Sequence, residues 1–167
     1  ALGQQGTIAR LRGDLGEAIE RWEEALRLCP ADDRDSRARL LYYLASVQRQ
    51  QCEFDRAGEL YREALDLYGE VANQLGEAQC LFGLATIAQD VGDLDTSERV
   101  FESLLRLFRR LGNRFGIAQA LNGLAGVAHL RGNLDEAGRG YGEAWDLLES
   151  IGSPASITAG LNVALLH

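Results

Sequence analysis

The chain of 167 residues has the length of one ordinary domain, and 46% hydrophobic with 25% charged residues is typical of a soluble globular protein. Its net charge of −8 opposes binding to nucleic acid or to an anionic membrane surface. No apolar run reaches the roughly 18 residues of a membrane-spanning helix, and no signal peptide opens the chain, so we expect a cytoplasmic protein. The lack of methionine, even at position 1, indicates a piece of a longer chain.

A short pattern recurs along the chain with a period of about 40 residues. Its leading residues are spaced by 39, 40 and 40 positions, and they are Gly13, Cys52, Gly92 and Gly132. An aromatic residue follows each of them nine positions later, at Trp22, Tyr61, Phe101 and Tyr141. The sequence therefore predicts four repeat units and the first helix of a fifth, with approximate limits 1–37, 38–76, 77–116, 117–156 and 157–167.

Each unit is predicted to be a pair of helices, because its apolar residues recur at steps of three and four. In the third unit this spacing runs from Ala78 to Ala88, stops at Gly92 and resumes from Val100 to Phe108. A turn of about four residues between two helices forces them into an antiparallel hairpin. The residues expected to cap the second helices are Gly16, Asp55, Asp95 and Asp135.

Packing between hairpins is expected to rest on small residues placed four positions before each aromatic ring. These small residues are Ala18, Ala57, Ser97 and Ala137. They allow two helix backbones to approach closely, and the ring fills the space toward the next hairpin. One hairpin cannot cover both of its apolar faces, so each unit needs its neighbour. We expect Trp22 to be buried between the first and second units.

This pattern resembles the tetratricopeptide repeat. The first helices carry the family's spaced residues as Leu41-Leu44-Ala45, Leu81-Leu84-Ala85 and Leu121-Leu124-Ala125, and the second helices carry its small and aromatic residues. The departures are Gln5, Cys52, Ser97 and Leu104. The resemblance covers essentially the whole chain and implies an all-α, right-handed superhelical solenoid of antiparallel helix hairpins. The period exceeds the family's usual length of about 34 residues, and such long units resemble those of bacterial signalling regulators and peptide-binding adaptors.

Motifs of catalysis are not found in this sequence. It holds no phosphate-binding G-x-x-x-x-G-K-[ST], no H-E-x-x-H, no C-x-x-C and no G-x-S-x-G. Gly138, Gly140 and Gly142 resemble a phosphate loop, but no strand precedes them, and we interpret them as part of a helix. Three cysteines and two histidines are too scattered for a disulfide framework or a zinc module. We therefore expect no enzymatic activity, no cofactor and no metal site.

The resemblance implies that the first helices of the units line a concave groove. Carried over position by position, the candidate binding residues are Arg10, Arg39, Tyr42, Arg49, Phe82, Gln89, Asn122, His129 and Asn162. The groove positions together hold three arginines and one aspartate, a charge of +2 on a chain of −8. One interpretation is chance, with polar side chains simply solvating these helices.

The other interpretation is a binding site for a peptide or a partner helix. The arginines would then pair with carboxylates, and Tyr42 and Phe82 would supply apolar anchors. Asn122 and Asn162, one unit apart, would hydrogen-bond the backbone of the peptide.

We expect from these features a non-enzymatic protein–protein interaction scaffold within a larger signalling or regulatory protein. Its partner is expected to be a protein or peptide of acidic character, with no nucleic acid and no membrane. The alternative is a self-association module. The chain begins and ends inside the first helix of a unit, so exposed apolar faces of the terminal hairpins would then join copies into a homo-oligomer.

Overall fold

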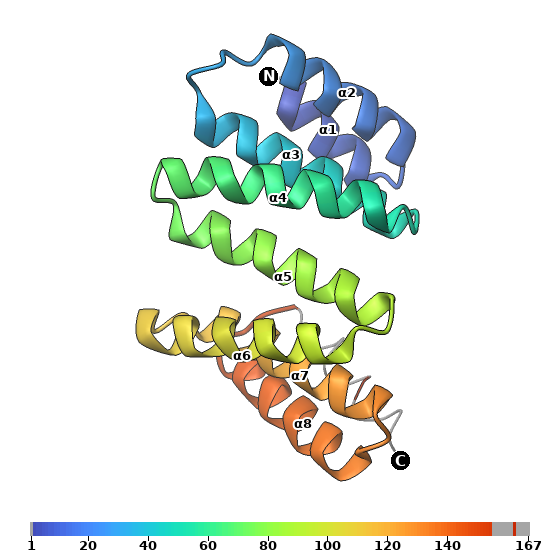
Figure 1. Ribbon diagram of the computed structural model, residues 1–167, viewed down its shortest axis with the longest axis vertical. Helices are drawn as coiled ribbons and strands as arrows, with labels where there is room; N and C mark the ends of the chain where they lie inside the picture. The colour runs from blue at the N-terminus through green and yellow to red at the C-terminus, as the bar shows by residue number, and fades with distance from the viewer. Residues whose placement is uncertain (1, 155–161, 163–167) are drawn as a thin grey trace. The chain divides into compact units, whose positions relative to one another are not determined.

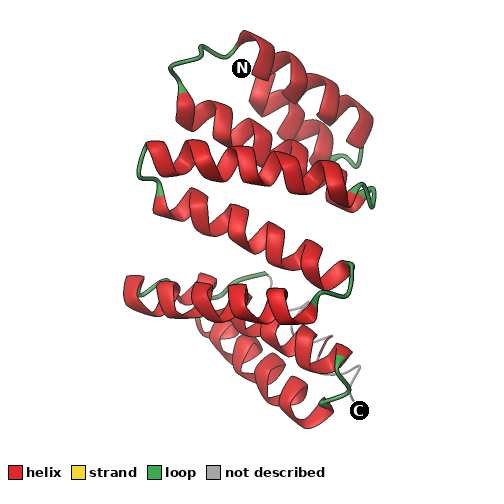
Figure 2. Ribbon diagram, viewed as in Figure 1, coloured by secondary structure: helices red, strands yellow, loops and turns green. Residues whose placement is uncertain are grey.

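Helices account for all the regular structure in the part of the chain that the computed structural model describes, residues 2–154 and 162 (Figure 2). Their bounds are α1 Leu2–Leu11, α2 Leu15–Leu28, α3 Arg34–Gln50, α4 Phe54–Glu70, α5 Gln74–Asp90, α6 Leu94–Leu111, α7 Arg114–Leu130 and α8 Leu134–Ser150. The expected all-α fold is confirmed. The limits of the repeat units stay a prediction, and apart from Asn162 the proposed fifth unit lies outside the described residues.

The chain forms two compact units, Ala1–Ile87 and Ala88–His167. In the first unit, α1 packs on α2, α2 on α3, and α3 on α4 (Figure 1). In the second unit, α6 packs on α7 and α7 on α8. Helix α5 gives its residues 74–87 to the first unit and 88–90 to the second. Consecutive helices are therefore the packing partners within each unit, as antiparallel hairpins require.

The same tight turn joins most consecutive helices. At the end of α5, Gly92 adopts a left-handed backbone with φ of 86°, and the Asp93 N–H donates to the Ala88 carbonyl at 2.8 Å. Both features define a Schellman ending, which satisfies carbonyls that the helix leaves unpaired. Cys52 and Ala72 occupy the left-handed position in their own turns, with φ of 62° and 54°. A side chain at such a position is strained, since only glycine adopts it freely.

The helix caps lie two residues earlier than the sequence analysis predicted. Asp93, not Asp95, caps α6, and its Oδ1 accepts the Thr96 N–H at 3.1 Å. The corresponding caps of the other second helices are Asp14, Glu53 and Asn133, in place of Gly16, Asp55 and Asp135. The reason is that the residue after the left-handed position is already the cap, so the next helix begins one residue later. Asp95 instead lies in the first turn, where the helix dipole favours a negative charge.

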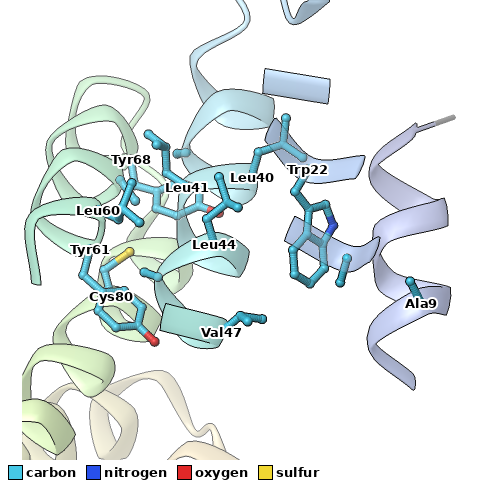
Figure 3. Close-up of a cluster of buried hydrophobic side chains, with 14 residues drawn as sticks. Ala9, Trp22, Leu40, Leu41, Leu44, Val47, Leu60, Tyr61, Tyr68 and Cys80 are labelled. Carbon is cyan, nitrogen blue, oxygen red and sulfur yellow. The ribbon is translucent and has the colours of Figure 1, made fainter. Parts of the chain in front are cut away.

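Trp22 belongs to the first unit's core, and its side chain is fully buried (Figure 3). Its indole Nε1–H donates to the Gly3 carbonyl of α1 at 3.0 Å. A Cβ atom at Gly6 would lie 2.5 Å from the same nitrogen, so the ring rests directly on the α1 backbone. Its other face meets α3 through Tyr43. The expected burial of Trp22 between the first and second hairpins is confirmed.

Aromatic rings resting on glycines join one hairpin to the next inside each unit. In the first unit the Tyr61 ring of α4 lies against Gly83 of α5, so close that an added Cβ would overlap it. In the second unit the Phe101 ring of α6 lies in the same way against Gly123 of α7, where a Cβ would come within 2.6 Å. The two pairs are 40 residues apart in the sequence, so the same ring-on-glycine contact recurs with the repeat period.

Candidate functional site

The candidate binding residues fall at repeated positions of the first helices of the hairpins. Arg10 of α1 and Arg49 of α3 are 39 residues apart, and both lie in the last turn of their helix. Gln89 and His129 continue this series at intervals of 40 residues in α5 and α7. A second series, also spaced by 40, consists of Tyr42, Phe82, Asn122 and Asn162. Of the nine candidates, Arg10, Arg39, Tyr42, Arg49 and Phe82 belong to the first unit.

Arg10 and Arg49 of the first unit both act electrostatically on Tyr42. Burial raises the pKa of the partly exposed Tyr42, and the positive charges of Arg10 and Arg49 act in the opposite direction. Arg49 also hydrogen-bonds Tyr61, a contact that opposes the increase in the pKa of this phenol caused by burial. The positive charges of two neighbouring first helices therefore act on the same phenol.

A series of aromatic contacts runs through the first unit. The Tyr42 ring lies 5.7 Å from Tyr43 and 5.8 Å from Tyr61, measured between ring centroids, and Tyr43 continues the chain to Trp22. The sequence analysis chose Tyr42 and missed Tyr43, since only the three-dimensional structure shows this side chain turned toward Trp22. These ring contacts join α2, α3 and α4 within the first unit.

A cavity of about 560 Å³ opens beside α3 in the first unit. Its lining comes from α1, from the end of α2 and from the start of α3, and consists of Leu2, Gly3, Gln4, Thr7, Ala25, Leu28, Cys29, Asp33, Ser36, Arg39, Leu40 and Tyr43. The volume lies in the range of small-ligand pockets. Sequence reasoning did not find it, because it depends on how three helix ends meet.

Arg39 stands at this cavity with an exposed side chain, and its Nη2 lies 3.4 Å from Ser36 Oγ. Asp33 lines the same cavity and caps α3, where its Oδ1 accepts the Ser36 N–H at 3.1 Å. Hydrogen bonds from Ser36 hold the pKa of Asp33 below its usual value, so the carboxylate is charged at neutral pH. The cavity therefore has one positive and one negative group on an otherwise largely apolar wall.

The remaining candidates are dispersed. Phe82 is partly buried in α5 of the first unit. In the second unit, Gln89 packs against α7, where a Cβ at Gly126 would lie 2.5 Å from its Nε2. His129 is exposed in the last turn of α7. No described contact joins Gln89 and His129 into one cluster.

Asn122 and Asn162 are brought together, although they are 40 residues apart. The Asn162 Nδ2–H donates to Asn122 Oδ1 at 3.1 Å in a partly buried position. An amide side chain has two N–H donors and a carbonyl acceptor, so this bond uses only part of the capacity of each. The two amides form a ladder with the repeat period.

Two classes of site are missing from the part of the chain that the structure describes. Within it, no group of three or more histidine, cysteine or acidic side chains is placed to hold a metal ion. The helices of this part include none whose length and hydropathy would allow it to cross a membrane.

Comparison with known proteins gives one family match. The model of the tetratricopeptide repeat family matches residues 1–70 and 71–150. The search of curated proteins gave no match.

Several solved structures share the fold. A Rap protein complexed with competence and sporulation factor superposes with a TM-score of 0.89 at 20% sequence identity, covering 99% of this chain and 46% of that chain. The apo form of RapI gives 0.82 at 14% identity, with 99% and 61% covered. BtubC from P. vanneervenii gives 0.77 at 19% identity, with 99% and 70% covered. The expected fold class, a helical solenoid of tetratricopeptide type, is confirmed, and the chain spans less than two thirds of either Rap structure.

Proposed function

Because this chain belongs to the tetratricopeptide repeat family, we propose that it is a non-enzymatic interaction scaffold that binds an acidic protein segment or peptide. The first helices of its hairpins provide the binding face. The observation that carries the proposal is the recurrence of arginine on the first helices of the first unit: Arg10 and Arg49 each lie in the last turn of their helix, and Arg39 lies on the same helix as Arg49. On a chain with a net charge of −8, a first-helix face with three arginines attracts carboxylates.

The second unit contributes polar contacts in this proposal. The Asn122–Asn162 ladder presents amide groups that suit a peptide backbone, and Gln89 and His129 extend the arginine series with an amide and an imidazole. Phe82 supplies an apolar contact. The Rap structure in the comparison holds competence and sporulation factor, which supports a peptide or protein as the class of ligand here. The scaffold is proposed to act in the cytoplasm as a module of a larger signalling or regulatory protein.

Affinity measurements test this function. Binding of matched acidic and basic peptides is measured by fluorescence anisotropy for the unaltered chain and for Arg39→Ala and Arg49→Ala. We expect the acidic peptides to bind more tightly, with each substitution weakening them about tenfold, since a charge-assisted pair is lost. Arg62→Ala is the control, because Arg62 is an exposed arginine of α4 outside this face. Equal affinity for both peptide classes, unchanged by either substitution, would contradict the proposal.

Self-association is the second candidate. Leu11 of α1 has 74% of its surface exposed and Ile8 has 48%, which provides an apolar patch at one edge of the first unit. Light scattering of the chain and of Leu11→Glu tests this candidate. A dimer that the glutamate dissociates would support it, and a monomer at all concentrations would exclude it.

A further inference from the structure

One long stretch of this acidic chain has no acidic residue. Residues 103–134, between Glu102 and Asp135, include no aspartate or glutamate, although the whole chain has 25. Within this stretch four arginines fall close together around the end of α6 and the start of α7, and they are Arg106, Arg109, Arg110 and Arg114. A chain with a net charge of −8 therefore has a concentrated positive region in its second unit.

The arginines of α6 reverse the charge that other hairpins have at the same repeat positions. In α6 these positions hold Arg106, Arg109 and Arg110. The residues 40 positions earlier in α4 and 40 positions later in α8 are acidic or neutral, and they are Asp66, Gly69, Glu70, Asp146, Glu149 and Ser150. The dipole of a helix favours cations near its last turn, but α4 and α8 end without any basic residue there. The helix end by itself therefore does not account for the three arginines.

The charges of these α6 arginines are only weakly compensated. Arg109 and Arg110 are exposed, and among residues 2–154 and 162 they have no ion-pair partner. Arg106 lies 3.7 Å from Glu102, but both side chains are exposed, and such a pair contributes little. Arg106 also donates to Ser103 Oγ at 3.0 Å, which is a neutral partner. The end of α6 is therefore free to attract an anionic group.

Arg114 differs from its counterpart in the first unit. In that unit Arg34 forms an ion pair with Glu70. The corresponding residues, 80 positions later, are Arg114 and Ser150, and the Arg114 Nη2–H donates to the serine Oγ at 2.8 Å. The serine keeps the contact between the helices but supplies no negative charge, so the charge of Arg114 is not neutralised by it.

Two exposed apolar side chains lie among these arginines. Leu111, the last residue of α6, has 50% of its surface exposed, and Phe115 in the first turn of α7 has 42%. Arginine and aromatic residues are enriched where proteins bind one another. The arginine patch is defined by these six residues: Arg106, Arg109, Arg110, Leu111, Arg114 and Phe115.

Acidic residues beside the arginine patch restrict the class of partner. The contact of Arg114 with Ser150 places the end of α8 next to the start of α7, and the exposed Asp146 and Glu149 lie in the last turn of α8. A membrane surface or a nucleic acid duplex presents phosphates over a wide area, so it would also meet these carboxylates and be repelled. A short acidic segment of a protein contacts the arginines without meeting them.

We propose that the arginine patch is a second interaction surface, which binds a short acidic segment of a partner protein with an aromatic side chain between its carboxylates. The carboxylates pair with Arg109, Arg110 and Arg114, and the aromatic side chain packs on Leu111 and Phe115. Three of the four arginines belong to α6, a second helix, whereas the proposed function uses the first helices. This surface therefore goes beyond the proposed function and does not depend on it.

The test uses a fluorescein-labelled synthetic peptide in which a central phenylalanine is flanked by two glutamates on each side, with a glutamine version as the control. Fluorescence anisotropy is measured for the chain with Arg39→Ala and Arg49→Ala, so that the first-helix arginines do not contribute. We expect the glutamate peptide to bind at least about tenfold more tightly than the glutamine peptide. Addition of Arg109→Glu and Arg110→Glu should weaken this binding at least about tenfold, because attraction becomes repulsion.

A matched control separates the arginine patch from the net charge of the chain. Arg62→Glu and Arg139→Glu together change the net charge by the same amount, at exposed arginines of α4 and α8. Because salt screens distant exposed charges, this control should change the affinity by less than about twofold. Phe115→Ser should weaken binding several-fold through loss of the apolar contact. Circular dichroism melting verifies that all variants are folded.

Three results would overturn the inference. The first is an equal loss of affinity in the Arg109→Glu, Arg110→Glu variant and in the matched control. The second is equal binding of the glutamate and glutamine peptides. The third is tighter binding to phosphatidylserine vesicles or to a DNA duplex than to the glutamate peptide, lost with the same two substitutions, since the partner would then be of another class.

The unaltered chain distinguishes this inference from the proposed function. If Arg109→Glu and Arg110→Glu weaken binding of the glutamate peptide while Arg39→Ala and Arg49→Ala do not, the arginine patch is supported and the proposed function fails. The opposite result overturns the arginine patch and leaves the proposed function standing.

Discussion

The Trp22 indole stacks on the Tyr43 ring with centroids 5.2 Å apart and an angle of 23° between the planes. Trp22 belongs to the first hairpin and Tyr43 to the second, so this pair joins them in the core. A stacked aromatic pair stabilises by more than the burial of its area alone. The packing of the first hairpin on the second therefore depends in part on this contact.

Trp22→Ala is expected to lower the free energy of unfolding by about 3–5 kcal/mol, because it removes a fully buried ring and its bond to Gly3. Urea denaturation followed by circular dichroism measures this loss. Trp145→Ala is the control, since Trp145 is 38% exposed and should cost clearly less. A loss below about 1 kcal/mol for Trp22→Ala would contradict the packing described above.

Gly83→Ala is expected to destabilise the chain by about 1–3 kcal/mol, although alanine is the better helix former. The added methyl group would overlap the Tyr61 ring. Gly142→Ala in α8 is the matched control, since a Cβ there has no heavy atom within 4 Å. This control should stabilise by up to about 1 kcal/mol. Thermal melts measure the melting temperatures of both variants. A change of the same sign in Gly83→Ala and Gly142→Ala would contradict the expected overlap with the Tyr61 ring.

Cys52→Gly is expected to stabilise the chain by about 1 kcal/mol, because Cys52 has a left-handed backbone with φ of 62°. Gly132→Ala makes the reverse change at φ of 81° and should destabilise by a similar amount. Chemical denaturation of both variants measures the pair. If neither substitution changes the free energy of unfolding, these turns accommodate a side chain without strain.

Ser97→Ala is expected to stabilise by about 1 kcal/mol. The Ser97 side chain is completely buried, and its hydroxyl finds no hydrogen-bond partner among the residues that the structure describes. Ser103→Ala is the control, because the Ser103 hydroxyl is exposed and donates to the Arg99 carbonyl at 2.9 Å. If Ser97→Ala instead lowers the melting temperature, the hydroxyl has a partner, such as a buried water molecule.

The buried thiol of Cys80 is expected to make the folded chain less stable at alkaline pH. Burial raises the pKa of its thiol from 9.0 to about 12, whereas the thiol of the unfolded chain ionises near the lower value. The raised pKa means that its contribution is complete below about pH 9 and is lost as the pH rises toward 12. Cys80→Ala should therefore lose less melting temperature than the unaltered chain between about pH 8 and pH 11. Cys52→Ala is the control, because Cys52 is exposed, and it should lose as much melting temperature as the unaltered chain. If the melting temperature falls equally with pH in the unaltered chain and both variants, the Cys80 thiol is not the cause of the loss.

The repeat made much of the fold predictable. The helical spacing, the glycine turns and the small-plus-aromatic positions all follow from local rules that each unit obeys separately, so the family resemblance and the all-α fold are both confirmed. The caps were predicted two residues too late, because acidic residues occur on both sides of the helix start. Only the backbone shows that Asp93 follows a left-handed glycine directly and is therefore the cap.

The candidate binding site was less predictable than the fold, because it depends on distances between helices. The family resemblance assigned the groove positions and so named Arg10 and Arg49, which occupy the same position of neighbouring first helices and both act on the pKa of Tyr42. It could not show the Tyr43 stack or the cavity beside Arg39, since both depend on the distances between helix ends. The sequence by itself determined which residues recur. The tertiary structure decided which of them touch, because contact depends on side-chain direction and helix separation, and a repeat period specifies neither.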